Sequence, residues 1–345
     1  MENVRLTQYS HGAGCGCKIS PSVLSEILAT KRGNKNVHPD LLVGYEQRDD
    51  AAVLDLKNGT ALISTTDFFM PIVDDPYDFG RIASVNAISD VYAMGGKPIL
   101  ALGILAWPIN QLSTDIASRV LEGARAVCQD AGIPLAGGHS IDSPEPIFGL
   151  SVNGIVNTEK LRQNSAAKKG DLLYLTKPIG VGIITTAQKK SIVSDEDYDT
   201  ALKSMLALNL AGDLVSELEY VHTMTDVTGF GLAGHLIELC EASGLSAELE
   251  LDKIPLLSSN LAAYVEKGSV PGGTQRNWKS YGHKVELHQS NHYIIADPQT
   301  SGGLLMAVAP NDQQSFERFM DSHKQTYWKV GQMIEKQSEV IYCKK

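Results

Sequence analysis

The chain has 345 residues, of which 43% are hydrophobic and 20% are charged, and its formal net charge at pH 7 is −10. This length favours two domains, and the acidic balance argues against binding to nucleic acid, which needs a basic surface. The cysteines are scattered, the amino terminus has no signal-peptide pattern, and no apolar run is long enough to cross a membrane, so we expect a cytoplasmic protein without a membrane anchor.

Residues 1–20 are predicted to form a flexible, glycine-rich arm. Its motif HGAGCGCKIS, residues 11–20, has three glycines at alternate positions, a spacing that disfavours both helix and strand. A cysteine reacts as its thiolate, and a neighbouring lysine lowers the pKa of a thiol, so Cys15 and Lys18 are a candidate reactive pair. The alternative is a loose tail in which both cysteines are incidental.

Residues 21–157 are predicted to form a first domain that contains both helices and strands. Apolar spacing and turn signals place helices at 21–28, 79–94 and 112–131, and strands at 51–56, 61–66, 98–107, 133–136 and 147–156. The glycine pair at 137–138 predicts a loop after the fourth of these strands. Carboxylates stand at strand ends, at Asp49, Asp50 and Asp67, and Asp90 shares a helix face with Asn86.

Residues 158–345 are predicted to form a second domain, after a polar boundary segment at 157–170. Helices are expected at 181–190, 200–220, 232–242, 260–267 and 312–323, and strands at 171–176, 224–226, 247–251, 304–308, 328–334 and 340–343. Loops are expected at 194–198, 271–274 and 297–303. Because helices and strands do not alternate one for one, we expect two α+β domains rather than a doubly wound parallel sheet.

The dispersed aspartates suggest a magnesium site. Mg²⁺ commonly takes one or two carboxylates and leaves its other positions to water and phosphate oxygens. Asp49, Asp50, Asp67, Asp90 and Asp226 could therefore meet over a nucleotide polyphosphate. The alternative for each of them is an ordinary turn or cap.

The common nucleotide and zinc motifs do not fit the chain. A Walker A motif needs glycine immediately before its lysine, but Cys17 precedes Lys18, and no dinucleotide fingerprint can start in the arm. A zinc site at Cys15 and Cys17 lacks the usual spacing and a second ligand pair. Gly229 and Gly231 form either an anion cradle at a helix N-terminus or a tight turn.

The remaining histidines and cysteines are mostly interpreted as structural. His139 lies in the expected loop, where a local hydrogen bond is favoured over a contact with phosphate or adenine. His235 lies inside a predicted helix. Cys128, Cys240 and Cys343 fall in patterned helix or strand and are expected to be buried thiols.

Seven motifs, in order along nearly the whole chain, resemble those of the selenophosphate synthetase (selenide, water dikinase) family. They are HGAGCGCK (11–18), RDDAA (48–52), STTDFF (64–69), NAISD (86–90), AGGHS (136–140), TDVTGFG (225–231) and DPQTSGG (297–303). The glycine–cysteine motif is the most specific to that family. The later motifs are partly shared with the wider aminoimidazole ribonucleotide synthetase superfamily.

The resemblance implies an enzyme that converts ATP, selenide and water into selenophosphate, AMP and orthophosphate, and so supplies selenium for selenocysteine and selenouridine. It implies two mixed domains of the aminoimidazole ribonucleotide synthetase type and a homodimer built on the amino-terminal domains. It also implies ATP as substrate, Mg²⁺ as cofactor and a selenium-delivery protein as a candidate partner.

The resemblance also implies a role for each matching residue. Cys15 and Lys18 match the catalytic cysteine and lysine. The metal ligands would be Asp50, Asp90 and Asp226. The nucleotide contacts would be Lys18, Gln47, Arg48, Asp49, Asp67 and Asp90, with Gly138, His139 and Ser140 contributed across the dimer.

Two other functions compete with this interpretation. An ATP-dependent ligase of the ribonucleotide-synthetase kind would use the same aspartates but would not need the arm with Cys15 and Lys18. A thiol protein that only carries selenium or a metal would use Cys15 and Cys17 and leave the aspartates without a role.

Overall fold

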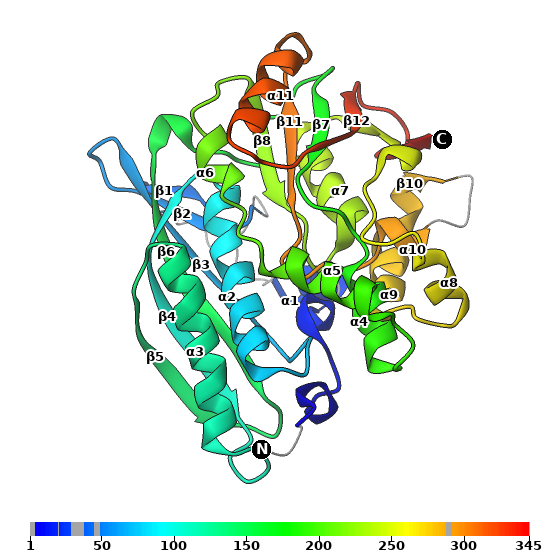
Figure 1. The fold of residues 1–345 in the computed structure, drawn as a ribbon. Coiled ribbons are helices and arrows are strands. Elements are labelled where there is room, and N and C mark those ends of the chain that lie inside the picture. The colour runs from blue at the N-terminus through cyan, green and yellow to red at the C-terminus, as the bar shows by residue number, and fades with distance from the viewer. Residues whose placement is uncertain (1–3, 20, 29–37, 45–48, 288–291, 345) are drawn as a thin grey trace.

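The computed structural model describes residues 4–19, 21–28, 38–44, 49–287 and 292–344 (Figure 1). Within these residues the strands form one mixed sheet in the amino-terminal half and another in the carboxy-terminal half. The predicted α+β architecture is therefore confirmed. No helix in the described ranges is both long and apolar enough to cross a membrane.

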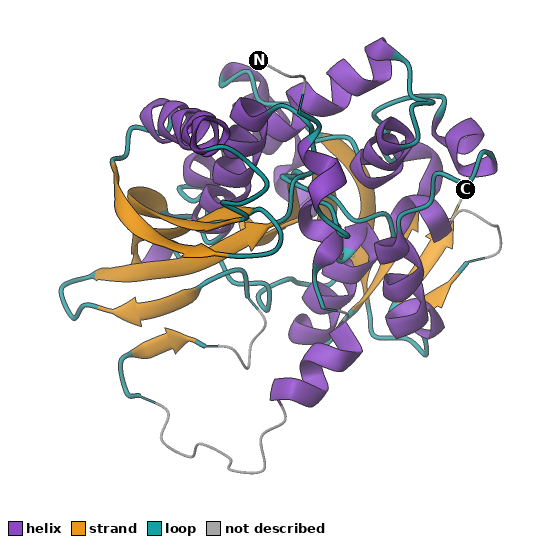
Figure 2. Ribbon diagram, turned by 90° about the horizontal axis from the view of Figure 1, so that it is seen from below, coloured by secondary structure: helices purple, strands orange, loops and turns teal. Residues whose placement is uncertain are grey.

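The amino-terminal sheet has the strand order β1-β2-β3-β6-β4-β5. Its strands are β1 (Leu41–Val43), β2 (Ala52–Asp55), β3 (Thr60–Phe69), β4 (Lys97–Trp107), β5 (Leu135–Asp142) and β6 (Ile147–Asn157). Along β3 buried and more exposed residues alternate, because successive side chains of a strand point to opposite faces of the sheet. Helices α2 (Pro76–Ala93) and α3 (Thr114–Asp130) lie over one of these faces (Figures 1 and 2).

Helix α2 lies between the two halves of the molecule (Figure 1). It begins at Pro76, and the side chain of Asp75 caps it by accepting the backbone N–H of Asp78. One side contacts β3 and β6 of its own sheet, and other positions contact helices α5 and α6 and strand β8 of the carboxy-terminal half. This double packing explains why 13 of the 18 residues of α2 are buried.

The carboxy-terminal sheet has the order β10-β13-β9-β12-β7-β11-β8. Its strands are β7 (Leu172–Leu175), β8 (Val221–Asp226), β9 (Ser246–Glu250), β10 (Val285–Glu286), β11 (Leu304–Val308), β12 (Trp328–Ile334) and β13 (Ile341–Lys344). The helices of this half are α4 (Val181–Lys189), α5 (Asp195–Leu206), α6 (Ala211–Val215), α7 (Gly231–Ser243), α8 (Leu261–Glu266), α9 (Gly272–Tyr281), α10 (His292–Ile295) and α11 (Gln313–Ser322). Helix α1 (Pro21–Leu28) follows the arm.

The loop expected at 137–140 is wrong, because these residues continue β5. They pair in parallel with β4, with Gly138 opposite Gly103 and His139 opposite Ile104. A Cβ atom at Gly138 would lie 2.0 Å from the carbonyl oxygen of Gly103, so the glycine allows this close pairing. Gly138 therefore serves strand pairing here and not a turn.

The helix expected at 200–220 is two helices. The first, α5, begins earlier, inside the acidic segment that was expected to be a connector, because Ser194 caps it and acidic residues favour its first turn. It ends at Leu206, and the following residues bend so that Asn209 can donate to the Ser89 hydroxyl and the Gly302 carbonyl. Tertiary contacts have overridden the local helical pattern.

Two smaller expectations also fail. The loop expected at 271–274 leads into α9, which begins at Gly272. Cys128 and Cys240 are buried as expected, but Cys343 is only half-buried. Ser20, the last residue of the HGAGCGCKIS motif, lies outside the described residues.

Candidate functional site

The arm lies against both halves of the molecule. Its residues Gly14–Cys17 form a short 3₁₀ helix. The backbone N–H of Gly14 donates to the carbonyl of Met70 (3.0 Å), just after β3, and that of Cys15 donates to the hydroxyl of Thr300 (3.0 Å). The guanidinium of Arg276, on α9, donates to the carbonyl of Gly16 (2.7 Å). The arm is therefore held in this position by amino-terminal and carboxy-terminal groups together.

Two glycines allow the arm to lie this deep. Gly14 has φ +50°, and a Cβ atom there would lie 2.4 Å from the hydroxyl oxygen of Thr300. A Cβ atom at Gly229 would lie 2.7 Å from the carbonyl oxygen of Cys15. Gly229 thus makes room for the arm, while Gly231, at φ +72°, forms the tight turn into α7.

The thiol of Cys15 is fully buried and donates to Oδ1 of Asn86 (Sγ to Oδ1, 3.2 Å). Burial raises the pKa of this thiol well above its ordinary value, and the charge of Asp67 raises it further. Lys18 acts in the opposite direction but does not outweigh burial. The expectation of a lowered thiol pKa is therefore wrong for this position of the arm, where Cys15 is a neutral thiol.

Lys18 lies among carboxylates. Its Nζ is 3.6 Å from Oδ1 of Asp67, and its side chain is 37% exposed. Burial lowers the pKa of Lys18, but the surrounding negative charges, Asp67 first among them, outweigh burial and raise it well above its ordinary value. Lys18 is therefore a permanent positive charge at this site.

Three further aspartates come from separate elements, and two of them, Asp90 and Asp226, act on Lys18. Asp50 accepts the hydroxyl of Thr225 (2.9 Å) just before β2, Asp90 on α2 accepts that of Thr65 (2.5 Å), and Asp226 at the end of β8 accepts that of Ser89 (2.6 Å). These contacts fix each carboxylate at a strand end or on α2.

Burial raises the pKa of these three carboxyls, and the charges of neighbouring aspartates raise it further. The pKa of Asp50 and of Asp90 lies well above the ordinary value, first through burial and then through the charge of Asp226. The pKa of Asp226 rises to about 6, with burial as the main cause. Oδ2 of Asp50 is buried without a hydrogen-bond partner among the described residues. A bound cation would satisfy such a group and lower all three pKa values.

The described part of the chain nevertheless contains no three acidic, histidine or cysteine side chains close enough to form a complete metal site. The aspartates influence one another electrostatically without converging on one point. This arrangement fits Mg²⁺ only if water and substrate oxygens complete its shell, as is usual for that ion.

The other predicted nucleotide contacts are distributed differently. Gln47 and Arg48 lie outside the described residues. Asp49 accepts the backbone N–H of Asn164 (2.6 Å), and burial raises its pKa to about 6. Gly138, His139 and Ser140 are exposed on β5 and are separated from Asp67 on β3 by strands β6 and β4. The structure therefore does not bring these three residues to the aspartates of the same chain.

Asn86, which the sequence placed on one helix face with Asp90, lies at the centre of the site. Thr300 and Ser301, which contact Cys15 and Asn86 respectively, were missed by the sequence reasoning. The glycine-rich motif at 297–303 was noticed, and its polar residues were the available signal. Lys177 is also buried here, donates to the carbonyls of Ala207 and Ser301 (2.6 and 2.9 Å) and has a pKa lowered to about 7 by burial. It carries no local sequence signal.

His235 is structural, as expected. It is buried on α7, and its Nε2 accepts the backbone N–H of Thr228 (3.1 Å). Burial lowers its pKa to about 3, so the ring is neutral at ordinary pH.

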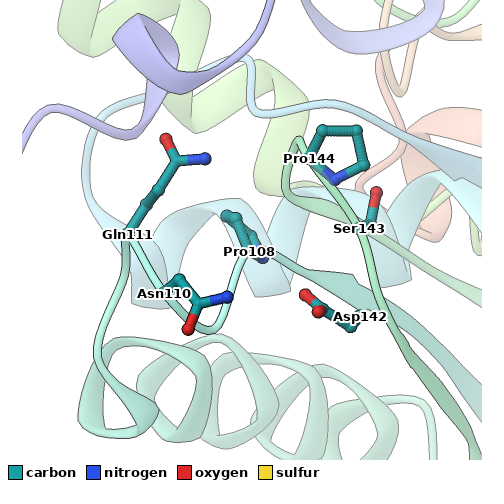
Figure 3. A pocket seen from close by; sticks show the side chains of 6 residues that line it. All are labelled: Pro108, Asn110, Gln111, Asp142, Ser143 and Pro144. Atoms are coloured by element: carbon teal, nitrogen blue, oxygen red, sulfur yellow. The ribbon is translucent and has the colours of Figure 1, made fainter.

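A surface hollow lies apart from this site (Figure 3). It is lined by Pro108, Asn110, Gln111, Asp142, Ser143 and Pro144. These residues follow β4 and end β5, and the lining includes neither arm residues nor the aspartates described above. A second hollow adjoins the arm, between its glycines and helices α4 and α9.

Comparison with known proteins places the chain among nucleotide-dependent enzymes. Residues 48–156 match the model of the AIR synthase related protein N-terminal domain, and residues 168–344 match that of the C-terminal domain. The chain is 56% identical to "Selenide, water dikinase" of Photorhabdus laumondii, over 97% of this chain and 96% of that protein. It is 59% identical to the protein of the same name from Escherichia coli O157:H7, over 89% and 88%.

A solved structure described as "AaThiL complexed with AMPPCP and TMP" has the same fold. The TM-score is 0.65 at 18% sequence identity, and the match covers 93% of this chain and 91% of that one. At this identity the similarity concerns the fold alone.

Proposed function

The chain belongs to the selenide, water dikinase family, and from that membership we propose that its inter-domain site makes selenophosphate, AMP and orthophosphate from ATP, selenide and water. One observation carries the proposal to this site. Lys18 lies 3.6 Å from Asp67 and is acted on by the charges of Asp90 and Asp226, and the Cys15 thiol is joined to Asp67 through the side chain of Asn86. A thiol suited to selenium and carboxylates suited to a metal–polyphosphate complex therefore share one site.

The residues divide the chemistry between them. Phosphoryl transfer depends mainly on positioning and on neutralising charge. Lys18, next to Asp67, supplies a positive charge that can meet the transferring phosphoryl group. We assign Asp67 and Asp49 to the nucleotide together with Gln47, Arg48 and Asp90. Cys15 positions the selenium atom that attacks the γ-phosphorus. The ADP formed stays bound and is hydrolysed to AMP and orthophosphate.

Asp50, Asp90 and Asp226 are the proposed Mg²⁺ ligands. Their raised pKa values and the unpartnered oxygen of Asp50 support a cation at this position. When bound, the ion would neutralise charge on the polyphosphate. The arm then covers the site and excludes water from the first transfer.

A homodimer is proposed through the uncovered face of the amino-terminal sheet. Pairing aligns Phe68, Gly149, Ile104 and His139 in one row across four strands. Phe68 is 50% exposed and Ile141, also on β5, is 57% exposed, and β5 is the edge strand of this sheet. Apolar side chains on an unpaired edge favour association with a second copy. In the dimer, Gly138, His139 and Ser140 are proposed to contact the partner's nucleotide.

The surroundings of the reaction are also part of the proposal. All five cysteines are free, which supports a reducing cytoplasm. Selenide is reactive and scarce, so a selenium-delivery protein is a candidate partner.

One assay tests the reaction. The protein is incubated without oxygen with Mg-ATP and selenide, phosphorus NMR detects a selenium-bonded phosphorus, and chromatography identifies the nucleotide product. We expect selenophosphate together with AMP. ADP as the final nucleotide would favour a ligase of the ribonucleotide-synthetase kind, and no nucleotide turnover would favour a thiol carrier.

A further inference from the structure

We propose that Asn86 is a positioning residue that, in the absence of nucleotide, holds the arm by accepting the thiol proton of Cys15 and so keeps Cys15 as an unreactive thiol. The catalytic meaning of this contact rests on the proposed function. The contact itself can be tested without ATP or selenide.

Every polar atom of the Asn86 side chain is used. The residue lies in the middle of α2 and is fully buried. Its Oδ1 accepts from the thiol of Cys15 (3.2 Å) and from the backbone N–H of Ser301 (2.7 Å), and its Nδ2 donates to Asp67. A single amide thus joins the arm, the 297–303 loop and strand β3.

The 297–303 loop is itself fixed by the carboxy-terminal half. Lys177 donates to the carbonyl of Ser301 (2.9 Å), and the Thr300 hydroxyl accepts the backbone N–H of Cys15 (3.0 Å). The backbone and the side chain of Cys15 are therefore held by two different elements. Asn86 on α2 holds the side chain, whereas Thr300 of the 297–303 loop holds the backbone.

An amide oxygen can accept the proton of a thiol but offers nothing to a thiolate. The other charged or titratable groups that act on Cys15 are Asp67 from β3 and Lys18 and Cys17 from the arm, and Lys18 lies close to Asp67. The neighbours from α2 and the 297–303 loop, Asn86 and Thr300, are neutral. The observed position of the arm therefore favours the thiol over the thiolate.

The test measures how fast iodoacetamide modifies Cys15 without nucleotide, with each cysteine followed by peptide mass spectrometry. Asn86→Leu removes the acceptor and should accelerate modification about fivefold, the effect of losing one hydrogen bond. Asn86→Asp retains an acceptor oxygen and should not accelerate it. A merely structural disturbance of the core would accelerate both variants.

Ser84→Ala is the matched control. Ser84 is also buried on α2, but its hydroxyl bonds to the carbonyl of Gly80 within the helix. This variant should react like the wild type. Equal acceleration in Asn86→Leu and Ser84→Ala, or in Asn86→Leu and Asn86→Asp, would overturn the proposal.

Circular dichroism shows whether the Asn86 variants fold. If they do not, the modification rates of Cys15 and Cys17 in the wild type still test the proposal. Cys17 is only half-buried, whereas Cys15 is fully buried against Asn86. In the wild type Cys17 should therefore be modified about ten times faster than Cys15. Equal rates would show that the Cys15 thiol is not held and would overturn the proposal.

Discussion

Cys15 and Lys18 are three positions apart, yet their surroundings act on them in opposite ways. Burial raises the pKa of the Cys15 thiol and keeps it neutral, whereas the neighbouring carboxylates keep Lys18 charged. The pair is therefore not a preformed thiolate and ammonium while the arm is closed. Reactivity at Cys15 depends on where the arm places it.

Local chemistry identifies only part of this site. Cys15, Lys18 and the aspartates were predictable because their residue types and motifs point to thiol, phosphate and metal chemistry. Asn86 and Thr300 contact Cys15 across 71 and 285 positions of sequence. Such contacts depend on how the two halves pack together, and no local pattern encodes them.

Asp297 should make stability depend on pH. It is fully buried, its Oδ2 accepts the N–H of Gly182 (2.9 Å), and burial raises its pKa to about 8. Its pKa in the unfolded chain is about 4, so the folded state binds the proton more tightly. The stabilisation that Asp297 contributes is therefore fully present below about pH 4 and is lost as pH rises towards about 8. Within this range the free energy of unfolding should fall by roughly 1 kcal/mol per pH unit.

Thermal unfolding of Asp297→Asn across this range checks the prediction. Between about pH 5 and about pH 8 the Tm of the wild type should fall as pH rises, and the Tm of the variant should fall less steeply. The exposed Asp130→Asn should keep the wild-type slope. Identical slopes for wild type and Asp297→Asn would show that Asp297 is ionised in the folded state.

At the scale of elements, substitution of Gly14 in the arm should reduce activity without disturbing the fold. Gly14→Ala places a methyl group on a residue at φ +50°, against the Thr300 hydroxyl, and should displace Cys15. We expect kcat for selenophosphate formation to fall at least about tenfold, as for a misplaced catalytic group. Circular dichroism should show an unchanged fold.

Gly59→Ala provides the comparison for this variant. Gly59 also has positive φ, +86°, but a Cβ atom there meets nothing within 4 Å. Its substitution should cost about 1–2 kcal/mol of stability through backbone strain and leave kcat unchanged. If Gly14→Ala retained full activity, a closely fitted arm would not be needed for the reaction.

Elements with strong local patterns were predicted well, and those shaped by their neighbours were not. Helix α7 and strand β6 follow apolar periodicity and match their expected ranges within about one residue. Strand β5 runs through a glycine pair because its backbone pairs with β4, which a turn signal cannot reveal. The break between α5 and α6 likewise serves the contacts of Asn209 with Ser89 of the amino-terminal half and with Gly302 of its own half.

For the whole molecule, the proposed dimer makes a prediction about the outer sheet face. Leu102→Glu combined with Ile141→Lys places charges on two exposed apolar positions of β4 and β5. Light scattering should show a dimer for the wild type and a monomer for this variant. Activity should fall with the dimer, because β5 is proposed to complete the partner's site.

Leu256→Lys is the control for this pair of substitutions. Leu256 is 45% exposed in the carboxy-terminal half, away from the amino-terminal sheet. The control should remain dimeric. A wild-type monomer, or a charged sheet face that still dimerises, would contradict the proposed interface.

The proposed function requires that the arm and the aspartates form one site that makes selenophosphate with Cys15. The most direct measurement is selenide-dependent AMP formation by the variant Cys15→Ser. Cys17→Ser is the control, because its serine hydroxyl can still donate to the carbonyl of Gly14, as the Cys17 thiol does. We predict that Cys15→Ser loses this activity while Cys17→Ser keeps most of it. Full selenide-dependent AMP formation by Cys15→Ser would contradict the account.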